Sequence, residues 1–215
     1  MKTSTNKIFK DLFTRFSEIN HLENQIKQAV KLIVTAKKNQ NKILVCGNGG
    51  SCTDAEHISG ELNKSFILKR EIPKALYKKI KELFPNDADM FLQNLQQGVP
   101  TISLPSLVAT NTAYNNDNLP QLTYAQLVYS MGFQGDILIC LSTSGESPNV
   151  VNAAKIAKVI GIKVISLTGR TGGKLKEFSD ILINVGEDEC YRIQELHLPI
   201  YHAICMAVES ELFGE

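Results

Sequence analysis

Hydrophobic residues follow two patterns along this chain: short continuous runs, and longer stretches with helical spacing. The runs read KILVC (42–46), PTISL (100–104), DILICL (136–141), KVISLT (163–168) and DILINV (180–185). Such runs are typical of parallel strands buried on both faces. Stretches with helical spacing separate them, at about 52–65, 120–131, 147–160 and 191–213. The alternation predicts an α/β fold with a five-stranded parallel sheet that helices cover on both faces.

Two segments lie outside this alternation. Residues 5–38 lack Gly and Pro and carry apolar residues at helical spacing, which predicts one long helix or two in tandem. Their apolar stripe is broad for a peripheral helix, so part of it is expected to pack on another subunit. Residues 66–98 form an insertion in which Pro85-Asn86 separates two short predicted helices, 73–83 and 87–97. The insertion is too short to be a domain, so residues 1–215 are predicted to form one domain. A lid, an oligomer contact and a surface decoration remain alternatives for the insertion.

Composition excludes several classes of protein. The 215 residues are 43% hydrophobic and 21% charged, with a net charge of +1, which implies no nucleic-acid or anionic-membrane partner. No apolar run approaches the roughly 18 residues of a membrane span. The first residues lack the features of a secretory signal, so a cytoplasmic protein is expected. The five cysteines are odd in number and form no C-x-x-C pair, so neither a disulfide framework nor a thiolate zinc site is predicted.

Two loops that follow predicted strands have the composition of an anion site. "LSTSGESPNVV" (141–151) offers hydroxyls ahead of a predicted helix that has Pro148 at its first position. Backbone N–H groups and the positive end of that helix would meet these hydroxyls, a combination that binds phosphate. "GNGGS" (47–51) is a second such loop; it lacks the Lys of a nucleotide P-loop and the last Gly of a dinucleotide loop. Together the two loops, called here the phosphate cradle, predict a small sugar phosphate as ligand.

Residues suited to proton transfer follow in two helical segments. His57 and Glu61 are four apart and share one helix face. "RIQELHLPIYH" (192–202) brings Gln194 and two of the four histidines of the chain. A histidine and a carboxylate in one site can serve as general acid and base.

The set CGNGGS–x–x–DA–x–H–x–x–x–E, STSG–x–S, LTG–x–x–GG and RIQE–x–H–x–x–x–x–H resembles phosphoheptose isomerases of the sugar isomerase (SIS) fold. The resemblance covers nearly the whole chain except 66–98. It implies a flavodoxin-like α/β/α sandwich with three layers and a homotetramer with active sites shared between subunits. The implied reaction converts sedoheptulose 7-phosphate to D-glycero-D-manno-heptose 7-phosphate through an enediol, for activated heptose biosynthesis.

The resemblance also implies roles for individual residues. Glu61 matches the catalytic base and His202 its partner acid. Some members bind zinc, at positions that match His57, Glu61, Gln194 and His202, and this ligand set suits zinc. The positions implied to bind substrate are Asn48, Gly49, Gly50, Ser51, Asn116, Asp117, Ser142, Thr143, Ser144, Ser147 and Gln194.

The spacing of two predicted zinc ligands does not readily fit a metal site on one straight helix. Gln194 and His202 are eight residues apart, about 12 Å along a helix and roughly 80° around it. Either both side chains reach toward one ion, or Pro199 bends the helix, or the two residues come from different subunits.

The chain also departs from the family pattern. Ser65 stands where the family has Arg in an E-L-x-G-R run, and Tyr191 stands where Asp often precedes RIQE. An isomerase of a different ketose phosphate is therefore an alternative. A non-catalytic SIS protein is another, either one that binds sugar phosphates or one that associates with a replication initiator.

Overall fold

The computed structural model describes residues 1–214, and at its centre is a parallel sheet with the strand order β2-β1-β3-β4-β5. All neighbouring strands run parallel. Each strand begins and ends within one residue of its predicted bounds, which confirms the predicted sheet. The strands are β1 (Ile43–Gly47), β2 (Thr101–Ser103), β3 (Ile137–Leu141), β4 (Lys163–Thr168) and β5 (Ile181–Asn184).

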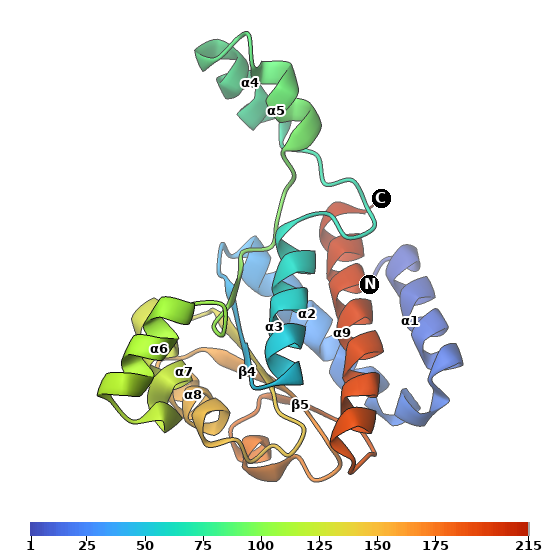
Figure 1. Cartoon of the computed structure of the whole chain (residues 1–215). Coiled ribbons are helices and arrows are strands. Elements are labelled where there is room, and N and C mark those ends of the chain that lie inside the picture. Colours follow the sequence, from blue (N-terminus) through green and yellow to red (C-terminus); the bar gives the residue numbers. More distant parts are fainter. Residues whose placement is uncertain (215) are drawn as a thin grey trace.

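Helices cover both faces of the sheet (Figure 1). Ile43 and Val45 of β1 belong to one hydrophobic core, and Leu44 and Cys46 belong to the other. This alternation is the direct result of strands that are apolar at every position. The first core is closed by α2 (Glu23–Lys38), α3 (Gly50–Asn63) and α9 (Cys190–Phe213), and the second by α7 (Thr123–Met131) and α8 (Pro148–Val159). The three-layer α/β/α arrangement is confirmed.

The N-terminal segment is two helices in tandem, α1 (Thr3–Arg15) and α2, joined by a 3₁₀ helix, η1 (Ser17–Leu22). α1 packs against α9 rather than on the sheet. Its buried side chains include Phe9 and Leu12. The expected contact with another subunit stays a prediction.

The sequence pattern missed one helix, α6 (Val108–Asp117). None of its side chains is buried, so it carries no apolar stripe that could reveal it. The body also contains two short 3₁₀ helices, η2 (Pro120–Leu122) and η3 (Gly173–Glu177).

The insertion 66–98, called here the arm, projects away from the body beyond the end of α3 (Figure 1). It contains α4 (Lys74–Leu83) and α5 (Ala88–Asn94), which confirms the two predicted helices. α4 has no buried side chain. At the base, Glu71 and Gln96 form an isolated antiparallel bridge. The helical part of the arm, α4 and α5, therefore lies away from α3 and α9 of its own chain (Figure 1).

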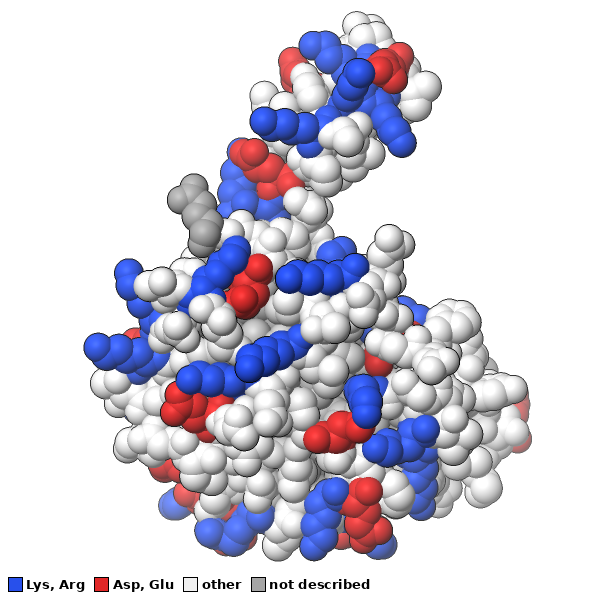
Figure 2. Space-filling model, turned by 180° about the vertical axis from the view of Figure 1, so that it is seen from behind, with Lys and Arg blue, Asp and Glu red and all other residues white. Residues whose placement is uncertain are grey.

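The helices in residues 1–214 are all too short or too polar to cross a membrane, and the cytoplasmic location stays a prediction. On the face drawn in Figure 2, positive and negative side chains are interspersed over the body.

Candidate active site

Tightly packed loops form the predicted phosphate cradle at the carboxyl edge of the sheet. The Ser142 Oγ lies 3.1 Å from the Ser147 Oγ and accepts the Gly145 N–H at 3.1 Å. Gly145 has a φ of +68°, and a Cβ there would lie 2.1 Å from the carbonyl oxygen of Gly172. Glycine at this position therefore lets the STSG loop lie against the LTG–x–x–GG loop.

The hydroxyls of the cradle differ in exposure. Ser51 and Ser142 are buried, whereas Ser144 is exposed, and its Oγ accepts the Glu146 N–H at 3.1 Å. The Thr143 Oγ1 lies 3.4 Å from the Cys190 Sγ. Ser147 directly precedes α8, whose positive N-terminal end favours an anion. The loop thus combines the exposed Ser144 hydroxyl and the half-buried Thr143 and Ser147 hydroxyls with a helix terminus, which suits a phosphate group.

Gln194 lies at the cradle. A Cβ on Gly50 would come within 2.4 Å of the Gln194 Nε2, so the amide packs directly on the start of α3. Asn48 and Asn149 exchange two amide hydrogen bonds, at 2.8 and 2.9 Å. These contacts join the GNGGS loop to the starts of α8 and α9.

A hollow of about 310 Å³ adjoins Asn48 and is lined by Asn111 and Asn115 of α6. The predicted sugar-lining residues Asn116 and Asp117 are exposed in the last turn of α6, where Asn116 donates to Asp117 at 2.8 Å. Neither of them lines this hollow. Asn111 and Asn115 are four residues apart and so share one helix face, a spacing that could have identified them if α6 had been predicted.

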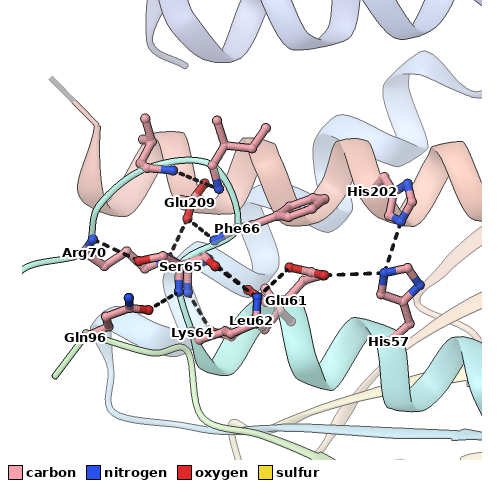
Figure 3. Close-up of polar contacts among 12 residues, drawn as sticks. His57, Glu61, Leu62, Lys64, Ser65, Phe66, Arg70, Gln96, His202 and Glu209 are labelled. Carbon is pink, nitrogen blue, oxygen red and sulfur yellow. Dashed lines mark hydrogen bonds and ion pairs between the residues drawn. The ribbon is translucent and has the colours of Figure 1, made fainter. Parts of the chain in front are cut away.

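The predicted base and acid meet where α3 and α9 lie side by side. The His57 Nε2 is 3.4 Å from the Glu61 Oε1 and 3.4 Å from the His202 Nε2 (Figure 3). Glu61 and His202 are therefore within about 7 Å of each other, on two sides of one nitrogen. The Lys64 Nζ lies 3.5 Å from the other Glu61 oxygen. Burial lowers the pKa of His202, and the nearby His57 lowers it further, which favours the neutral imidazole.

Two further residues, which the sequence did not reveal, join this group. The Tyr201 hydroxyl donates to the Asp54 Oδ1 at 3.1 Å and lies 3.1 Å from the His57 Nδ1. The available signals were that Asp54 belongs to the motif CGNGGS–x–x–DA–x–H and that Tyr201 directly precedes His202. Asp54, His57, Glu61, Tyr201 and His202 are called here the histidine–carboxylate cluster.

A buried ion pair fixes the end of α3 beside this cluster (Figure 3). The Arg70 Nε donates to the Glu209 Oε1 at 2.7 Å, and both side chains are fully buried. The other Arg70 nitrogens donate to the carbonyl oxygens of Leu62, at 2.7 Å, and Glu61, at 2.9 Å. Arg70 thus holds the backbone of Glu61, and a guanidinium reaches this end of α3 although Ser65 replaces the arginine of the E-L-x-G-R run.

The segment that follows α3 is anchored to the same carboxylate. Glu209 accepts the N–H groups of Phe66, Ile67 and Leu68 at 2.8 to 3.0 Å. The Phe66 ring lies 5.6 Å from the His202 ring. The base of the arm is therefore in contact with both predicted proton-transfer residues.

Of the four predicted zinc ligands, one chain brings together only His57, Glu61 and His202. Gln194 lies at Gly50, a contact seven residues from His57 on α3. α9 runs through Pro199 as one continuous helix, and Gln194 and His202 contact different parts of α3. In residues 1–214, no three His, Cys, Asp or Glu side chains have a geometry that could hold a metal ion. A single chain therefore does not fit the four-ligand set, and zinc stays a prediction.

Comparison with known proteins agrees with the fold. The family model described as "SIS domain" matches residues 8–95 and 97–169, so the chain is an SIS-domain protein. It is 36% identical over 194 residues to a phosphoheptose isomerase of Aliarcobacter butzleri, covering 90% of this chain and 89% of that one.

Two solved phosphoheptose isomerases have the same fold. The protein of Francisella tularensis gives a TM-score of 0.75 at 31% identity, over 97% of this chain and 100% of that one. The protein of Neisseria gonorrhoeae gives 0.73 at 30% identity, over 94% and 95%. The chain belongs to the phosphoheptose isomerase family.

Proposed function

We propose that this chain interconverts sedoheptulose 7-phosphate and D-glycero-D-manno-heptose 7-phosphate, a step toward activated heptose. Membership of the family makes the chain a sugar-phosphate isomerase. The observation that carries the proposal is the contact of Glu61 and His202 with one nitrogen of His57. A protein that only bound sugar phosphates would not need this arrangement.

The reaction moves a proton between C1 and C2. The Glu61 carboxylate removes the proton from C1 of the ketose and returns it to C2 of the cis-enediol. His202 gives a proton to the C2 carbonyl oxygen and takes one from the C1 hydroxyl. Because Glu61 and His202 lie within about 7 Å of each other, both can reach one bound enediol. Neutral His202 can accept or donate a proton, as reversible exchange requires.

The phosphate end would be held by neutral donors. The hydroxyls of Thr143, Ser144 and Ser147, together with the start of α8, would bind the phosphate group. Held there, the sugar is oriented for the proton transfer.

Replacing Ser144 with Ala is expected to raise KM for the phosphorylated sugar about tenfold while changing kcat little. The reason is that a hydrogen bond to a charged group contributes about 1.5 kcal/mol or more and here acts on bound substrate and transition state alike. Steady-state kinetics measure both constants. Ser130→Ala is the matched control, because the Ser130 hydroxyl donates to the Leu127 carbonyl, outside the cradle. Equal KM values for the two variants would remove Ser144 from the phosphate site.

The distance between the two halves of the site supports a site shared between subunits. Glu61 lies ten residues beyond Ser51 on α3, about 15 Å along the helix. His202 lies about 12 Å beyond Gln194 on α9. An extended heptose phosphate is shorter than the distance of about 15 Å between Ser51 and Glu61 along α3. The cradle of one subunit would therefore face the histidine–carboxylate cluster of another, in the homotetramer that the family resemblance implies.

Mixing two inactive variants is expected to restore activity if sites are shared. Glu61→Gln damages only the cluster, and the double change Ser142→Ala with Ser144→Ala damages only the cradle. Mixed tetramers then contain some sites with both halves intact. Co-expression and sizing at about four times 23.8 kDa test this. No recovery in a mixed tetramer, or a clean monomer, would contradict the shared site.

The reaction itself is tested by NMR. Purified protein is incubated with sedoheptulose 7-phosphate, with chelator or with added zinc, and the aldose phosphate is followed. Product formation supports the proposed reaction, and a requirement for zinc would support the metal. Product only from another ketose phosphate would favour that alternative substrate. Binding without turnover of any ketose phosphate would favour a non-catalytic protein.

A further inference from the structure

The Tyr201 hydroxyl lies between a carboxylate and an imidazole of the histidine–carboxylate cluster. It donates to the Asp54 Oδ1 at 3.1 Å, and its oxygen is 3.1 Å from the His57 Nδ1. Tyr201 is 2% exposed. The second Asp54 oxygen, Oδ2, is also buried and has no hydrogen-bond partner in residues 1–214. The Asp54 carboxylate thus relies on Tyr201 for its one hydrogen bond from a side chain.

The number of protons determines the direction of these hydrogen bonds. A phenol carries one proton, and an ionised carboxylate only accepts, so the Tyr201 proton points to Asp54. The ordinary pKa of a tyrosine is about 10, so the phenol keeps this proton at neutral pH. The Tyr201 oxygen then accepts a hydrogen bond in its other contact, from a proton on the His57 Nδ1.

Ring packing holds the same arrangement. The His57 and Tyr201 rings meet edge to face with centroids 5.5 Å apart, and the Tyr201 and His202 rings do so at 5.0 Å. With its Nδ1 protonated, neutral His57 has a free electron pair on Nε2. That atom faces the His202 Nε2 and the Glu61 Oε1, each at 3.4 Å.

We propose that Asp54 and Tyr201 are positioning residues that hold His57 in its Nδ1–H tautomer, with the Nε2 electron pair facing the His202 Nε2 beside Glu61. This inference rests on the proposed isomerase function for its consequence in catalysis. The His57 Nε2 accepts the Nε2–H of His202, which fixes the orientation of the His202 ring. Once the Glu61 carboxyl has taken the proton from carbon, the same electron pair can instead accept a hydrogen bond from Glu61. The same tautomer leaves Nε2 free to bind a metal, since a ligating histidine commonly donates its other N–H to a neighbouring oxygen.

The test uses Tyr201→Phe, which keeps the ring and removes the hydroxyl, and Asp54→Asn, which keeps the shape and removes the charge. The matched control is Tyr77→Phe, because the Tyr77 hydroxyl also donates to an aspartate, Asp89, at 2.8 Å, but on the arm. The first readout is the ¹⁵N NMR spectrum of the histidine side chains in the full-length protein, in which the two ring nitrogens report the tautomer. His57 resonances are assigned by their loss in His57→Gln.

We expect His57 to be the Nδ1–H tautomer in the wild type and in Tyr77→Phe, and to change tautomer or become mixed in Tyr201→Phe and Asp54→Asn. We expect kcat to fall about tenfold to a hundredfold in the two cluster variants, the range for residues that orient a functional histidine. KM should stay within about twofold, because the cradle lies at the other end of the α3–α9 pair.

An Nε2–H tautomer of His57 in the wild type would overturn the proposal. So would an unchanged tautomer in Tyr201→Phe. A fall in kcat without any change of tautomer would assign Tyr201 to packing alone. If the wild type turned over no ketose phosphate, the isomerase function would fail, while the NMR spectra would still decide the tautomer.

Discussion

Glu61→Gln is expected to lower kcat by about 10² to 10⁴, the usual contribution of a general base. The amide has the shape of the carboxyl but cannot take the proton from carbon. The side chain of Glu61 is 14% exposed and touches His57 and Lys64, so its replacement should leave the fold intact. Release of deuterium from C1-labelled substrate measures the proton transfer directly.

The matched control is Glu56→Gln, one helical turn and a little more before Glu61 on α3. Glu56 is exposed, and its carboxylate accepts a hydrogen bond from Ser106 at 3.0 Å, away from the cluster. This variant should keep wild-type kcat. Turnover by Glu61→Gln within tenfold of the control would exclude Glu61 as the base.

Glu209→Gln is expected to lower the free energy of unfolding by about 3 to 5 kcal/mol. The reason is that this change leaves the buried guanidinium of Arg70 without its counter-charge. It also weakens the acceptor of three backbone N–H groups at the base of the arm. Urea denaturation at pH 7 measures the loss.

The pH dependence of stability gives an independent test of Glu209. Burial raises the pKa of its carboxyl, but the N–H groups of Phe66, Ile67 and Leu68 and the side chain of Arg70 outweigh burial and lower the pKa below its ordinary 4.5. A lowered folded-state pKa stabilises the fold above pH 4.5, and this contribution is lost as the pH falls through the folded-state value. The variant should lack this part of the acid dependence.

Glu211→Gln serves as the control for the same helix. Glu211 is only half-buried and accepts the N–H of Lys2 at 2.7 Å. Within residues 1–214 it has no buried counter-charge that the change would leave unpaired, so its replacement should cost under about 1 kcal/mol. Equal losses for the two glutamate variants would show that the Arg70–Glu209 pair does not anchor this region.

Part of the site was predictable because its residues lie close together in the sequence. The STSG–x–S loop follows a strand and precedes a helix, so its hydroxyls had to lie at the carboxyl edge of the sheet. His57 and Glu61 were placed on one face by helical geometry alone.

Other predictions could not be made from local patterns. α6 has no buried face, and therefore no periodicity distinguishes it from a loop. Asn116 and Asp117 stay predicted substrate residues, but only the path of α6 determined that Asn111 and Asn115 line the hollow beside Asn48. The distance between Gln194 and His202 along a helix could be calculated from the sequence. The choice among the three explanations for that distance also required knowing which residues of α3 each side chain faces.

The sequence by itself determined the five strands, the helices that cover them, and the residue types of both halves of the site, because each depends on spacing within one element or one loop. Only the tertiary structure decided which side chains meet across α3 and α9. His57 and His202 are 145 residues apart, Asp54 and Tyr201 are 147, and Arg70 and Glu209 are 139. These contacts depend on how far one helix is shifted along the other. That shift is decided by side-chain packing between the helices, which no periodicity within a single helix records.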